Sequence, residues 1–450
     1  MAKDTPIGSH HPDDKPNWHN AAPEWYRDGV GHVWLPYAQM QTAAPPLPVV
    51  ATEGVHIKLA DGAELIDGIG SWWTACHGYN HPHIAAGMTA QIEQMPHVMF
   101  GGLGHEAGYS LAARLARLTP GDLDHVFFAD SGSVSVEVAL KMALQYWLNK
   151  GIEGRTSFVT FAQGYHGDTW AAMSVTDLDQ GMHQAFGDQL QDQFVADLPQ
   201  NAGQVAALDR LLSEGRDSIA AMIVEPLVQG AGGMKFHDPQ VLTALRELAD
   251  RHEVLLIADE IFTGFGRTGT LFACEQADIV PDILCLGKGM TGGAISLAAT
   301  IARDHVHEAF LSDDPAKALM HGPTYMANPL ACAAANASLD LFETEPRLEQ
   351  VKAIETCLRD ALEACRGLKR VVDVRVKGAI GVVQVDALDD LDWLKQRFID
   401  EGVWLRPFGD IVYVTPAFVI EQRELTKLAD TIVAVLTEWD ARFKVGAPGS

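Results

Sequence analysis

Residues 254–293, VLLIADEIFTGFGRTGTLFACEQADIVPDILCLGKGMTGG, contain two continuous apolar runs that each end in charged residues. The first run ends in Asp259 and Glu260, and the second ends in Lys288. Continuous apolar runs of this length are typical of buried strands in a parallel sheet. Because ligands of open α/β sheets bind at the carboxyl ends of the strands, we expect Asp259 and Lys288 to face one pocket.

An acid and an amine at neighbouring strand ends suit one kind of covalent chemistry. A lysine removed from water is a good nucleophile for a carbonyl group, with which it forms a Schiff base. A carboxylate opposite the lysine can hold the protonated ring nitrogen of a cofactor. The pair therefore predicts a cofactor bound through Lys288, with its ring nitrogen at Asp259.

Composition excludes several classes of protein. The formal net charge of −26 disfavours nucleic acid as a partner. No apolar run approaches the roughly 20 residues that a membrane helix needs, and the polar N-terminus lacks a signal-peptide pattern, so we expect a cytoplasmic protein. The six cysteines are far apart and form no Cys-x-x-Cys pair, which argues against a disulfide framework or a zinc ribbon.

Strand and helix patterns alternate through the middle of the chain, and this alternation predicts a mostly parallel sheet flanked by helices. The alternation breaks beyond about Leu348, where an antiparallel strand pair and a closing helix are expected. We therefore predict an α/β fold with a large domain and a smaller α+β domain. The expected parts are a flexible lead-in (1–30), an N-terminal segment that joins the small domain and contains a hairpin around Asp61-Gly62 (31–70), the large domain (71–345) and the C-terminal small domain (346–450).

Two segments are candidates for binding a phosphate and a flat ring. After the strand HVFFAD, the small residues Ser131, Gly132 and Ser133 begin a helix, whose first backbone N–H groups can hold a phosphate. An ordinary helix cap is the alternative. Tyr165 and His166 are flanked by glycines, so that an aromatic ring can present its face to a ligand. Simple packing is the alternative there.

Other candidates lie far apart in the chain. Tyr37 is a candidate pocket residue, although packing against Trp34 on the surface is the more frequent role of such a tyrosine. Arg406 lies between a strand and a proline, where its guanidinium can bind a carboxylate; a surface arginine is the alternative. The histidines of the segment 71–83 lack a carboxylate or cysteine at ligand spacing, so we predict no metal site.

Three other functions fit the sequence less well. GFGRTG, residues 264–269, fits the Gly-x-Gly-x-x-Gly pattern of a nicotinamide-dependent oxidoreductase. That fingerprint requires its first glycine at a strand end and a helix starting at its last, and neither condition holds here. No serine lies in a Gly-x-Ser-x-Gly elbow, which disfavours a serine hydrolase. A non-catalytic binding protein has no reason to place a lysine opposite a buried acid.

Taken together, the segments resemble a known family. They are SWWTACHGYNHP, HVMFGGLGH, ADSGSVSVEVALKMALQYW, GYHGDTWAAMSV, IVEPLVQGAGGM, LLIADEIFTGFGRTG, PDILCLGKGMTGG, HGPTYMANPLACAAANASL and VWLRPFG. From about Trp34 onward the chain is similar to the class III, fold-type I aminotransferases that use pyridoxal phosphate. Within that class it looks most like the subfamily that acts in biotin biosynthesis.

The resemblance implies an activity and a set of site residues. The expected reaction is ping-pong: S-adenosylmethionine donates its amino group, which passes through pyridoxamine phosphate to 8-amino-7-oxononanoate and gives 7,8-diaminononanoate. Another ω-aminotransferase with a different donor or acceptor remains the alternative. Lys288 is expected to bind the cofactor covalently and Asp259 to pair with its ring nitrogen, both as catalytic residues together with Tyr37.

The remaining roles follow from the same resemblance. Gly132 and Ser133 are expected at the phosphate and Tyr165 on the ring, while the partner subunit of a homodimer supplies Pro323 and Thr324. The residues expected to contact the substrates are Tyr37, Trp72, Tyr165, Gly322 and Arg406, of which Arg406 binds the carboxylate of the oxononanoate. Leu35 departs from the family pattern, which has a histidine there, and this departure concerns the amino-donor pocket.

Overall fold

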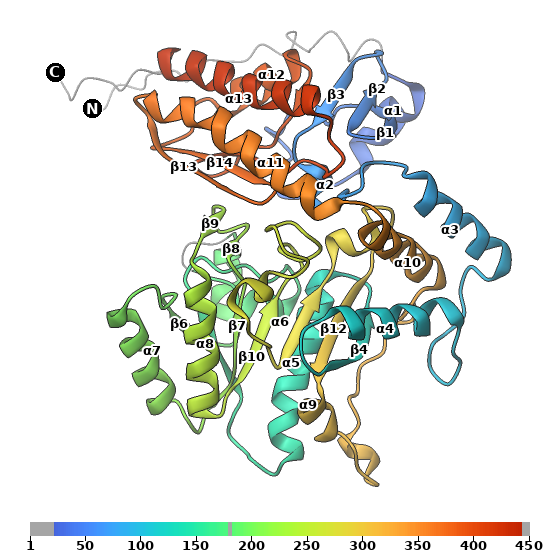
Figure 1. Cartoon of the computed structure of the whole chain (residues 1–450), viewed down its shortest axis with the longest axis vertical. Helices are drawn as coiled ribbons and strands as arrows, with labels where there is room; N and C mark the ends of the chain where they lie inside the picture. The colour runs from blue at the N-terminus through green and yellow to red at the C-terminus, as the bar shows by residue number, and fades with distance from the viewer. Residues whose placement is uncertain (1–21, 179–181, 443–450) are drawn as a thin grey trace.

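The computed structural model describes residues 22–178 and 182–442. Figure 1 shows a lower body built around a large sheet and an upper body of smaller sheets and helices. The first strands of the chain and its last helices both lie in the upper body. Segments from the two ends of the chain therefore meet above the large sheet.

The large sheet has seven strands in the order β4-β12-β11-β10-β7-β5-β6. Only β12 runs antiparallel to its neighbours, so the prediction of a mostly parallel sheet is confirmed. The strands are β4 (Leu123–Ala129), β5 (Ser157–Phe161), β6 (Phe194–Ala196), β7 (Ile219–Val224), β10 (Leu255–Asp259), β11 (Ile283–Leu286) and β12 (Ala298–Arg303).

Helices cover both faces of this sheet, which explains why its central strands are apolar throughout. On β10, Leu255 and Ile257 pack in one core cluster with helix α5, whereas Leu256 and Ala258 pack in a second cluster that contains residues of α8. The helices of the lower body are α3 (Pro82–Gln94), α4 (Glu106–Leu118), α5 (Gly132–Asn149), α6 (Trp170–Ser174), α7 (Ala202–Glu214), α8 (Pro239–His252), α9 (Asp304–Glu308) and α10 (Pro329–Thr344).

Local capping explains where several of these helices begin. The Asn328 side chain accepts hydrogen bonds from the Leu330 and Ala331 amides at 3.1 and 3.2 Å, and Pro329 is the first helical residue of α10. This start was predicted from the sequence, because asparagine satisfies free amides and proline has no amide to satisfy. The Ser131 hydroxyl caps α5 in the same way, accepting from the Val134 amide at 3.3 Å.

The upper body contains two small sheets. One has the order β1-β2-β3-β15 and the other the order β13-β14-β16. Their strands are β1 (Val49–Glu53), β2 (His56–Leu59), β3 (Glu64–Asp67), β13 (Val371–Lys377), β14 (Ile380–Val385), β15 (Val403–Trp404) and β16 (Ile411–Val414). The helices of the upper body are α11 (Arg347–Leu362), α12 (Leu391–Asp400) and α13 (Gln422–Arg442). In the lower body, β7 is followed by a two-stranded ribbon of β8 (Val228–Gln229) and β9 (Lys235–Phe236).

Pairing in these sheets agrees with two local predictions. Strands β2 and β3 form the hairpin expected around Asp61-Gly62, and β13 pairs antiparallel with β14. Strand β15 pairs in parallel with β3, so the N-terminal segment and the C-terminal region share one sheet. We propose on this basis that residues 31–70 form one unit with residues 346–450.

The lead-in predicted to be flexible over residues 1–30 contains a helix near its end. Residues 1–21 lie outside the described part of the chain, but helix α1 (Glu24–Gly29) and a 3-10 turn (Val30–His32) follow. A tertiary contact holds this helix: Tyr26 is buried and its hydroxyl donates to the Pro46 carbonyl at 2.6 Å. A helix of six residues is too short to show apolar periodicity, so the sequence pattern missed it.

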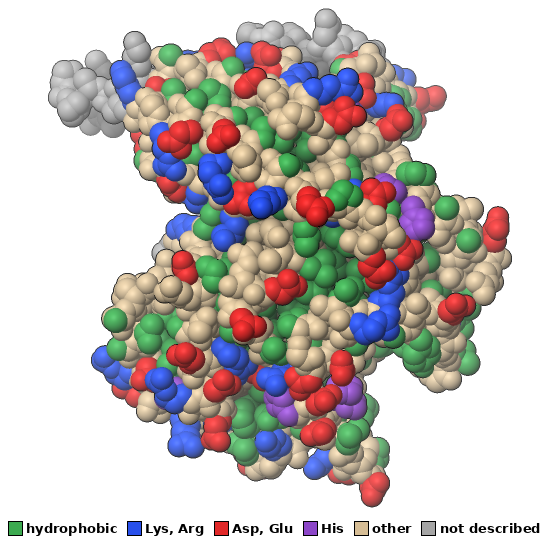
Figure 2. Space-filling view, in the orientation of Figure 1, with side chains coloured by type: hydrophobic (Ala, Val, Ile, Leu, Met, Phe, Trp, Pro, Cys, Tyr) green, Lys and Arg blue, Asp and Glu red, His purple; other side chains and the backbone are tan. Residues whose placement is uncertain are grey.

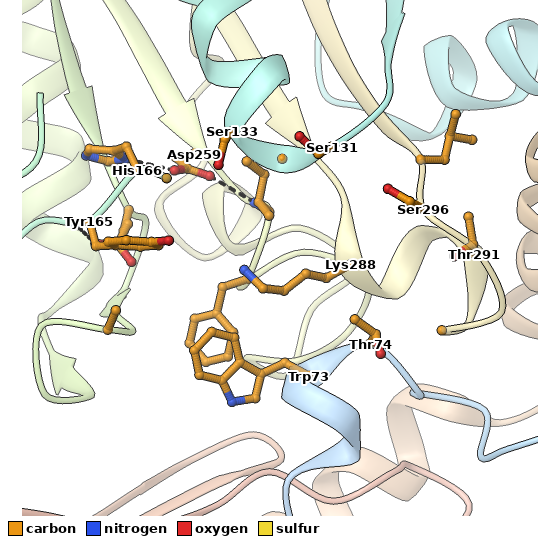
Figure 3. Close-up of a pocket in the computed structure, with 18 of the residues that line it drawn as sticks. Trp73, Thr74, Ser131, Ser133, Tyr165, His166, Asp259, Lys288, Thr291 and Ser296 are labelled. Carbon is orange, nitrogen blue, oxygen red and sulfur yellow. Dashed lines mark hydrogen bonds and ion pairs between the residues drawn. The ribbon is translucent and has the colours of Figure 1, made fainter. Parts of the chain in front are cut away.

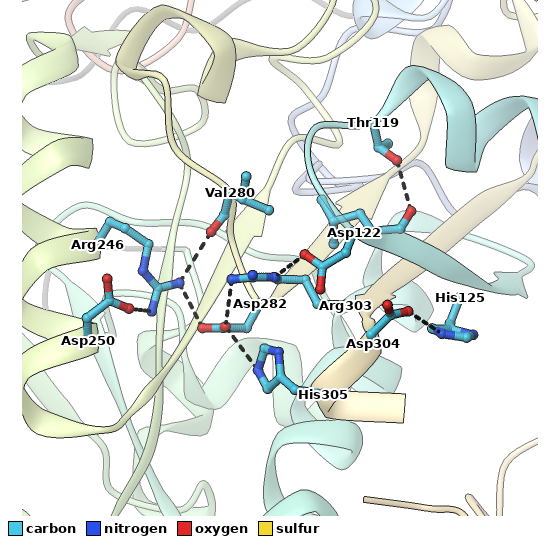
Figure 4. Close-up of polar contacts among 11 residues, drawn as sticks. Thr119, Asp122, His125, Arg246, Asp250, Val280, Asp282, Arg303, Asp304 and His305 are labelled. Atoms are coloured by element: carbon cyan, nitrogen blue, oxygen red, sulfur yellow. Dashed lines mark hydrogen bonds and ion pairs between the residues drawn. The ribbon is translucent and has the colours of Figure 1, made fainter. Parts of the chain in front are cut away.

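A cluster of charges stabilises the other end of the strands that carry the expected pocket. The buried Asp282 carboxylate, just before β11, lies 2.9 Å from Arg246 Nη1 and 3.2 Å from His305 Nε2, and it accepts from the Leu256 amide at 2.7 Å (Figure 4). Arg246 belongs to α8 and His305 to α9. One carboxylate therefore connects two helices to two strands.

The contacts of Asp282 make its charge favourable in the folded state. Burial alone would raise its pKa, but the hydrogen bonds from His305 and Arg246 outweigh burial and hold the pKa below its ordinary value. A carboxyl group with a lowered folded-state pKa contributes stability above its unfolded-state pKa, and this stability disappears as the pH falls through the folded-state value.

We expect Asp282→Asn to lower the free energy of unfolding by about 3 kcal/mol at pH 7, because it leaves the largely buried Arg246 without this charged partner. The difference between the two proteins shrinks below about pH 4, where the carboxyl group of the unfolded wild-type chain binds a proton, and it disappears only below the lowered folded-state pKa. Urea unfolding of both proteins at pH 7 and pH 3 measures the effect. The same difference at both pH values would contradict the electrostatic role.

Candidate active site

The acid and the amine predicted from residues 254–293 line one cavity. Asp259 is the last residue of β10, which pairs in parallel with β11, and Lys288 follows β11 after Gly287. The cavity has a volume of about 440 Å³ and lies at the carboxyl ends of these strands. Figure 3 shows the Lys288 side chain pointing into the space between Tyr165, Asp259 and Trp73. Its lining also includes Ser131, Gly132, Ser133, His166, Gly167, Glu225, Thr291 and Ser296.

Lys288 has an amine without a partner. Among residues 22–178 and 182–442 no hydrogen bond or ion pair to its Nζ is formed, and the Nζ lies 4.9 Å from the centre of the Trp73 ring. Desolvation lowers the pKa of the amine, although the charges of Asp259 and Glu225 act in the opposite direction. A lysine in this state has a larger neutral fraction near pH 8, which is the form that attacks carbonyl carbon.

Asp259 is held on both of its oxygens. Its Oδ2 lies 2.7 Å from His166 Nδ1, and its Oδ1 accepts from the Ile261 amide at 3.1 Å. Asp259 is 5% exposed and His166 is 3% exposed. The carboxylate is therefore oriented before any ligand arrives. The sequence does not predict the contact between His166 and Asp259, because the two residues lie 93 positions apart in the chain.

The start of helix α5 forms a wall with little room for side chains. A Cβ atom on Gly132 would lie 2.9 Å from the Cγ2 of Ile261, and one on Gly167 would lie 2.3 Å from the Ser133 hydroxyl. The Ser133 hydroxyl accepts from the Asp168 amide at 3.1 Å. Backbone amides in the first turn of a helix have no partner inside the helix, so they are available to an anion.

Asp168 connects two of the predicted tyrosines. The Tyr165 hydroxyl donates to its Oδ1 at 2.9 Å, the Tyr37 hydroxyl donates to its Oδ2, and His183 Nε2 lies 2.9 Å from Oδ1. Asp168, 131 residues from Tyr37 in the chain, thus connects Tyr37 to Tyr165, which lines the cavity. Asp168 and His183 were missed, since a lone acid after a glycine carries no specific signal in the sequence.

A left-handed turn places two tryptophans at the mouth of the cavity. In α2 (Gly70–Trp73) the φ angles of Gly70, Ser71, Trp72 and Trp73 are 54°, 49°, 55° and 72°. Such backbone costs on the order of 1–3 kcal/mol for each non-glycine residue, and it clusters at functional sites. Trp73, which the sequence prediction passed over in favour of Trp72, is the one that lines the cavity.

Trp72 instead joins Tyr37 and Arg406. Its ring lies 6.0 Å from the Tyr37 ring, and the Arg406 guanidinium lies 4.4 Å from its centre. Within the described chain, Arg406 has no hydrogen bond or ion pair, and desolvation lowers its pKa. The structure therefore brings together three of the five predicted substrate residues, Tyr37, Trp72 and Arg406, just outside the lining of the cavity.

Gly322, Pro323 and Thr324 do not join the site within one chain. They precede α10, and none of them belongs to the lining of the cavity. Gly322 and Thr324 are exposed. The contribution of this loop to the site of a partner subunit stays a prediction.

Other features of the structure bear on the alternatives. The GFGRTG segment forms turns, and no helix begins at Gly269; its Arg267 is buried and donates to the Ala379 and Pro416 carbonyls. Over the described ranges there is no group of three His, Cys, Asp or Glu side chains suited to a metal ion, and no helix there is long and apolar enough to cross a membrane. Acidic and basic side chains are interspersed on the face in Figure 2.

Comparison with known proteins decides the family. The model of the aminotransferase class-III family matches residues 37–436. The chain belongs to the class-III aminotransferases. A Mycobacterium leprae relative named adenosylmethionine-8-amino-7-oxononanoate aminotransferase is 46% identical over 415 residues, which cover 90% of this chain and 95% of that protein. The subfamily predicted from the sequence segments is thereby confirmed.

Solved structures of class-III aminotransferases and their relatives agree with this assignment. The adenosylmethionine-8-amino-7-oxononanoate aminotransferase of Methanocaldococcus jannaschii has a TM-score of 0.87 at 30% identity, covering 92% of this chain and 98% of that one. An amine transaminase from an uncultivated Pseudomonas species, solved in its PLP-bound form, has a TM-score of 0.82 at 33% identity, covering 91% and 98%. The prediction of a fold-type I architecture is confirmed.

The unpartnered amine leads to a testable expectation. In the ligand-free chain, acylation of Lys288 by a small anhydride should show a pH midpoint below the ordinary lysine value of 10.5, because desolvation favours the neutral amine. Lys58, whose pKa is raised by its hydrogen bond to Glu53, provides the internal comparison. Peptide mass spectrometry across a pH series measures both residues at once, and coincident midpoints would contradict the assignment.

Proposed function

We propose that this class-III aminotransferase transfers an amino group from S-adenosylmethionine to 8-amino-7-oxononanoate, giving 7,8-diaminononanoate. The observation that carries the proposal is the unpartnered, desolvated amine of Lys288 in one cavity with the buried carboxylate of Asp259. The choice of substrates is supported by the shared name of the curated relatives, which are up to 46% identical to the chain.

The residues of the cavity fit pyridoxal phosphate, the cofactor of this family. A volume of about 440 Å³ is within the usual range of small-molecule sites. Gly132, at the start of α5, packs so closely against Ile261 that a Cβ would not fit there. The backbone amides of this first helical turn can bind a phosphate. Lys288 supplies the amine that binds the aldehyde, Asp259 supplies a carboxylate for the ring nitrogen, and Tyr165 supplies an aromatic wall.

Each residue then has a task in the reaction. When bound, pyridoxal phosphate supplies an electron-accepting ring that takes up charge from the deprotonated substrate carbon. Asp259, oriented by His166, would keep the proton on the ring nitrogen of the bound cofactor. With the cofactor bound, the Lys288 amine would accept the proton that leaves the substrate carbon and pass it to the cofactor carbon, as transfer of an amino group requires. Trp73 and Tyr165 keep water away from that carbon.

Residues beyond the cavity contact the two substrates. The Arg406 guanidinium, which has no partner in the described chain, binds the carboxylate of 8-amino-7-oxononanoate in a bidentate pair. In this substrate the carboxylate and the reacting ketone lie at opposite ends of the carbon chain. This separation suits the position of Arg406 outside the cavity lining. Tyr37 and Trp72 form the apolar walls between the two ends.

A homodimer completes the site in this proposal. The loop with Gly322, Pro323 and Thr324 carries two large exposed apolar side chains, Met320 at 76% and Tyr325 at 55% exposure. Exposed apolar side chains gathered in one segment are typical of protein contacts. Burial of this loop against a second copy would bring Pro323 and Thr324 to the phosphate and Gly322 to the substrate of that copy.

The proposal is tested with purified enzyme loaded with pyridoxal phosphate. Single-turnover reactions with S-adenosylmethionine, lysine and other amines identify the donor, and mass spectrometry detects diaminononanoate after 8-amino-7-oxononanoate is added. We expect S-adenosylmethionine to support product formation. Lys288→Ala is the control and should lose both the visible absorption of the bound cofactor and turnover, because it lacks the amine. Product formation only with another donor would replace the proposed one.

The role of Arg406 is tested by separating the two half reactions. Arg406→Ala should reduce kcat/KM for 8-amino-7-oxononanoate by at least about 30-fold, the equivalent of one charge-assisted bidentate pair. The donor half reaction should change much less, because the donor carboxylate is attached to the reacting carbon itself, inside the cavity. Arg423→Ala is the control, because Arg423 is an exposed arginine. A buried arginine such as Arg267 is unsuitable for this purpose. Equal losses in both halves would contradict the assignment.

A further inference from the structure

Lys288 lies in a strained turn. It begins the 3-10 turn η5 (Lys288–Thr291) and has a φ angle of +41°, in the left-handed region that side chains other than glycine rarely adopt. A residue in this conformation costs on the order of 1–3 kcal/mol and keeps it only where its surroundings impose it. Some contact outside the turn must therefore hold the backbone next to the lysine.

The carbonyl oxygen of Gly289 is the point at which the turn is held. It accepts from the Gly292 amide at 3.0 Å inside the turn. It also accepts hydrogen bonds from the Cys76 thiol at 3.4 Å and the Ser338 hydroxyl at 3.5 Å, which belong to two other segments of the chain. The residue directly after Lys288 is thus connected to the segment after α2 and to helix α10.

Ser338 is itself the last member of a chain of hydrogen bonds. Arg347 Nε donates to His77 Nδ1 at 3.0 Å, and His77 Nε2 lies 3.0 Å from the Ser338 hydroxyl oxygen. Arginine has donors only, so Nδ1 must accept and the ring proton is on Nε2. His77 therefore donates to Ser338, whose own proton is left for Gly289. Because arginine can only donate, Arg347 fixes the donor and the acceptor in each hydrogen bond of this chain.

The surroundings keep this direction constant. His77, Ser338 and Arg347 are 2%, 0% and 2% exposed. Desolvation, followed by the nearby charge of Arg347, lowers the pKa of His77 to about 3, so the ring stays neutral across the pH range in which aminotransferases work. Packing adds to the hydrogen bonds: a Cβ on Gly292, the residue that ends the turn, would lie 3.2 Å from Cδ2 of His77.

We propose that His77 is a positioning residue for Lys288, acting through Ser338 and the Gly289 carbonyl to hold the strained turn that aims the lysine amine into the cavity. The proposal rests on the proposed function for the catalytic task of Lys288. Arg347, at the start of α11, orients His77, so the upper body contributes to the geometry of the lysine in the lower body.

Four variants of the loaded enzyme test this role. His77→Phe keeps a ring but removes both hydrogen bonds, and Ser338→Ala removes only the hydroxyl between His77 and Gly289. His77→Gln can accept from Arg347 with its carbonyl and donate to Ser338 with its amide, so it should restore the chain. His83→Ala is the matched control, because His83 lies in the same segment and contacts α10 through Asp340 without reaching the turn.

Two readouts separate positioning from general stability. The single-turnover rate with S-adenosylmethionine should fall about tenfold or more in His77→Phe and Ser338→Ala, with KM changed less than about twofold, because a displaced amine slows proton transfer more than binding. The pH midpoint for acylation of Lys288 in the ligand-free chain should rise by about half a unit as the turn loosens toward water. His77→Gln and His83→Ala should stay within about twofold of wild type in rate.

The outcomes are distinguishable. Wild-type rate and midpoint in folded Ser338→Ala would overturn the positioning role, and this small change decides the question even where circular dichroism shows that His77→Phe does not fold. Equal losses in His83→Ala would also overturn it, since they would indicate a general effect of the segment. Failure of the wild type to bind pyridoxal phosphate would count against the proposed function, whereas the acylation midpoint tests His77 without any cofactor.

Discussion

An amine without a partner in a desolvated cavity is the constraint on which this structure depends. A lysine in water is protonated and solvated, and a lysine beside a carboxylate is protonated and paired. Here Asp259 shares the cavity but is engaged by His166 and the Ile261 amide, so it does not form an ion pair with Lys288. The two groups face one cavity without pairing, because Asp259 ends β10 and Lys288 lies in the turn that follows β11.

The backbone near this amine is strained, and hydrogen bonds from other segments hold it in the strained conformation. The left-handed backbone at Ser71, Trp72 and Trp73 and the positive φ at Lys288 are unfavourable by themselves. Each occurs where a segment of the upper body meets the lower body. The Asp67 carboxylate accepts from the Ile69 and Ser71 amides at 2.9 and 2.7 Å, which holds the first of these turns. Function therefore depends on packing between the two bodies as well as on the sheet.

In the proposed function, the reacting centre is separate from the groups that would choose the substrate. Lys288, Asp259 and Tyr165 line the cavity, while Arg406 and Trp72 lie outside it and come from the upper body. Asp168 connects the two sets, since it accepts from both Tyr37 and Tyr165. If the outer residues choose the substrate as proposed, substrate choice can change within one family without disturbing the inner residues, and the structural relatives include varied transaminases.

The sequence by itself determined the strands, the helix starts and the family. Continuous apolar runs, the Asn328-Pro329 start and the alternation of strands with helices depend on local chemistry, which is why the sheet and the placement of Asp259 and Lys288 could be predicted. It did not reveal helix α1, whose stability comes from the burial of Tyr26. Only the tertiary structure decided that Trp73 rather than Trp72 lines the cavity, that His166 contacts Asp259 and Asp168 contacts Ser133, and that His77 joins Arg347 to Ser338. These contacts join residues 35 to 270 positions apart, and no pattern in the sequence encodes which distant side chain will complete a hydrogen bond.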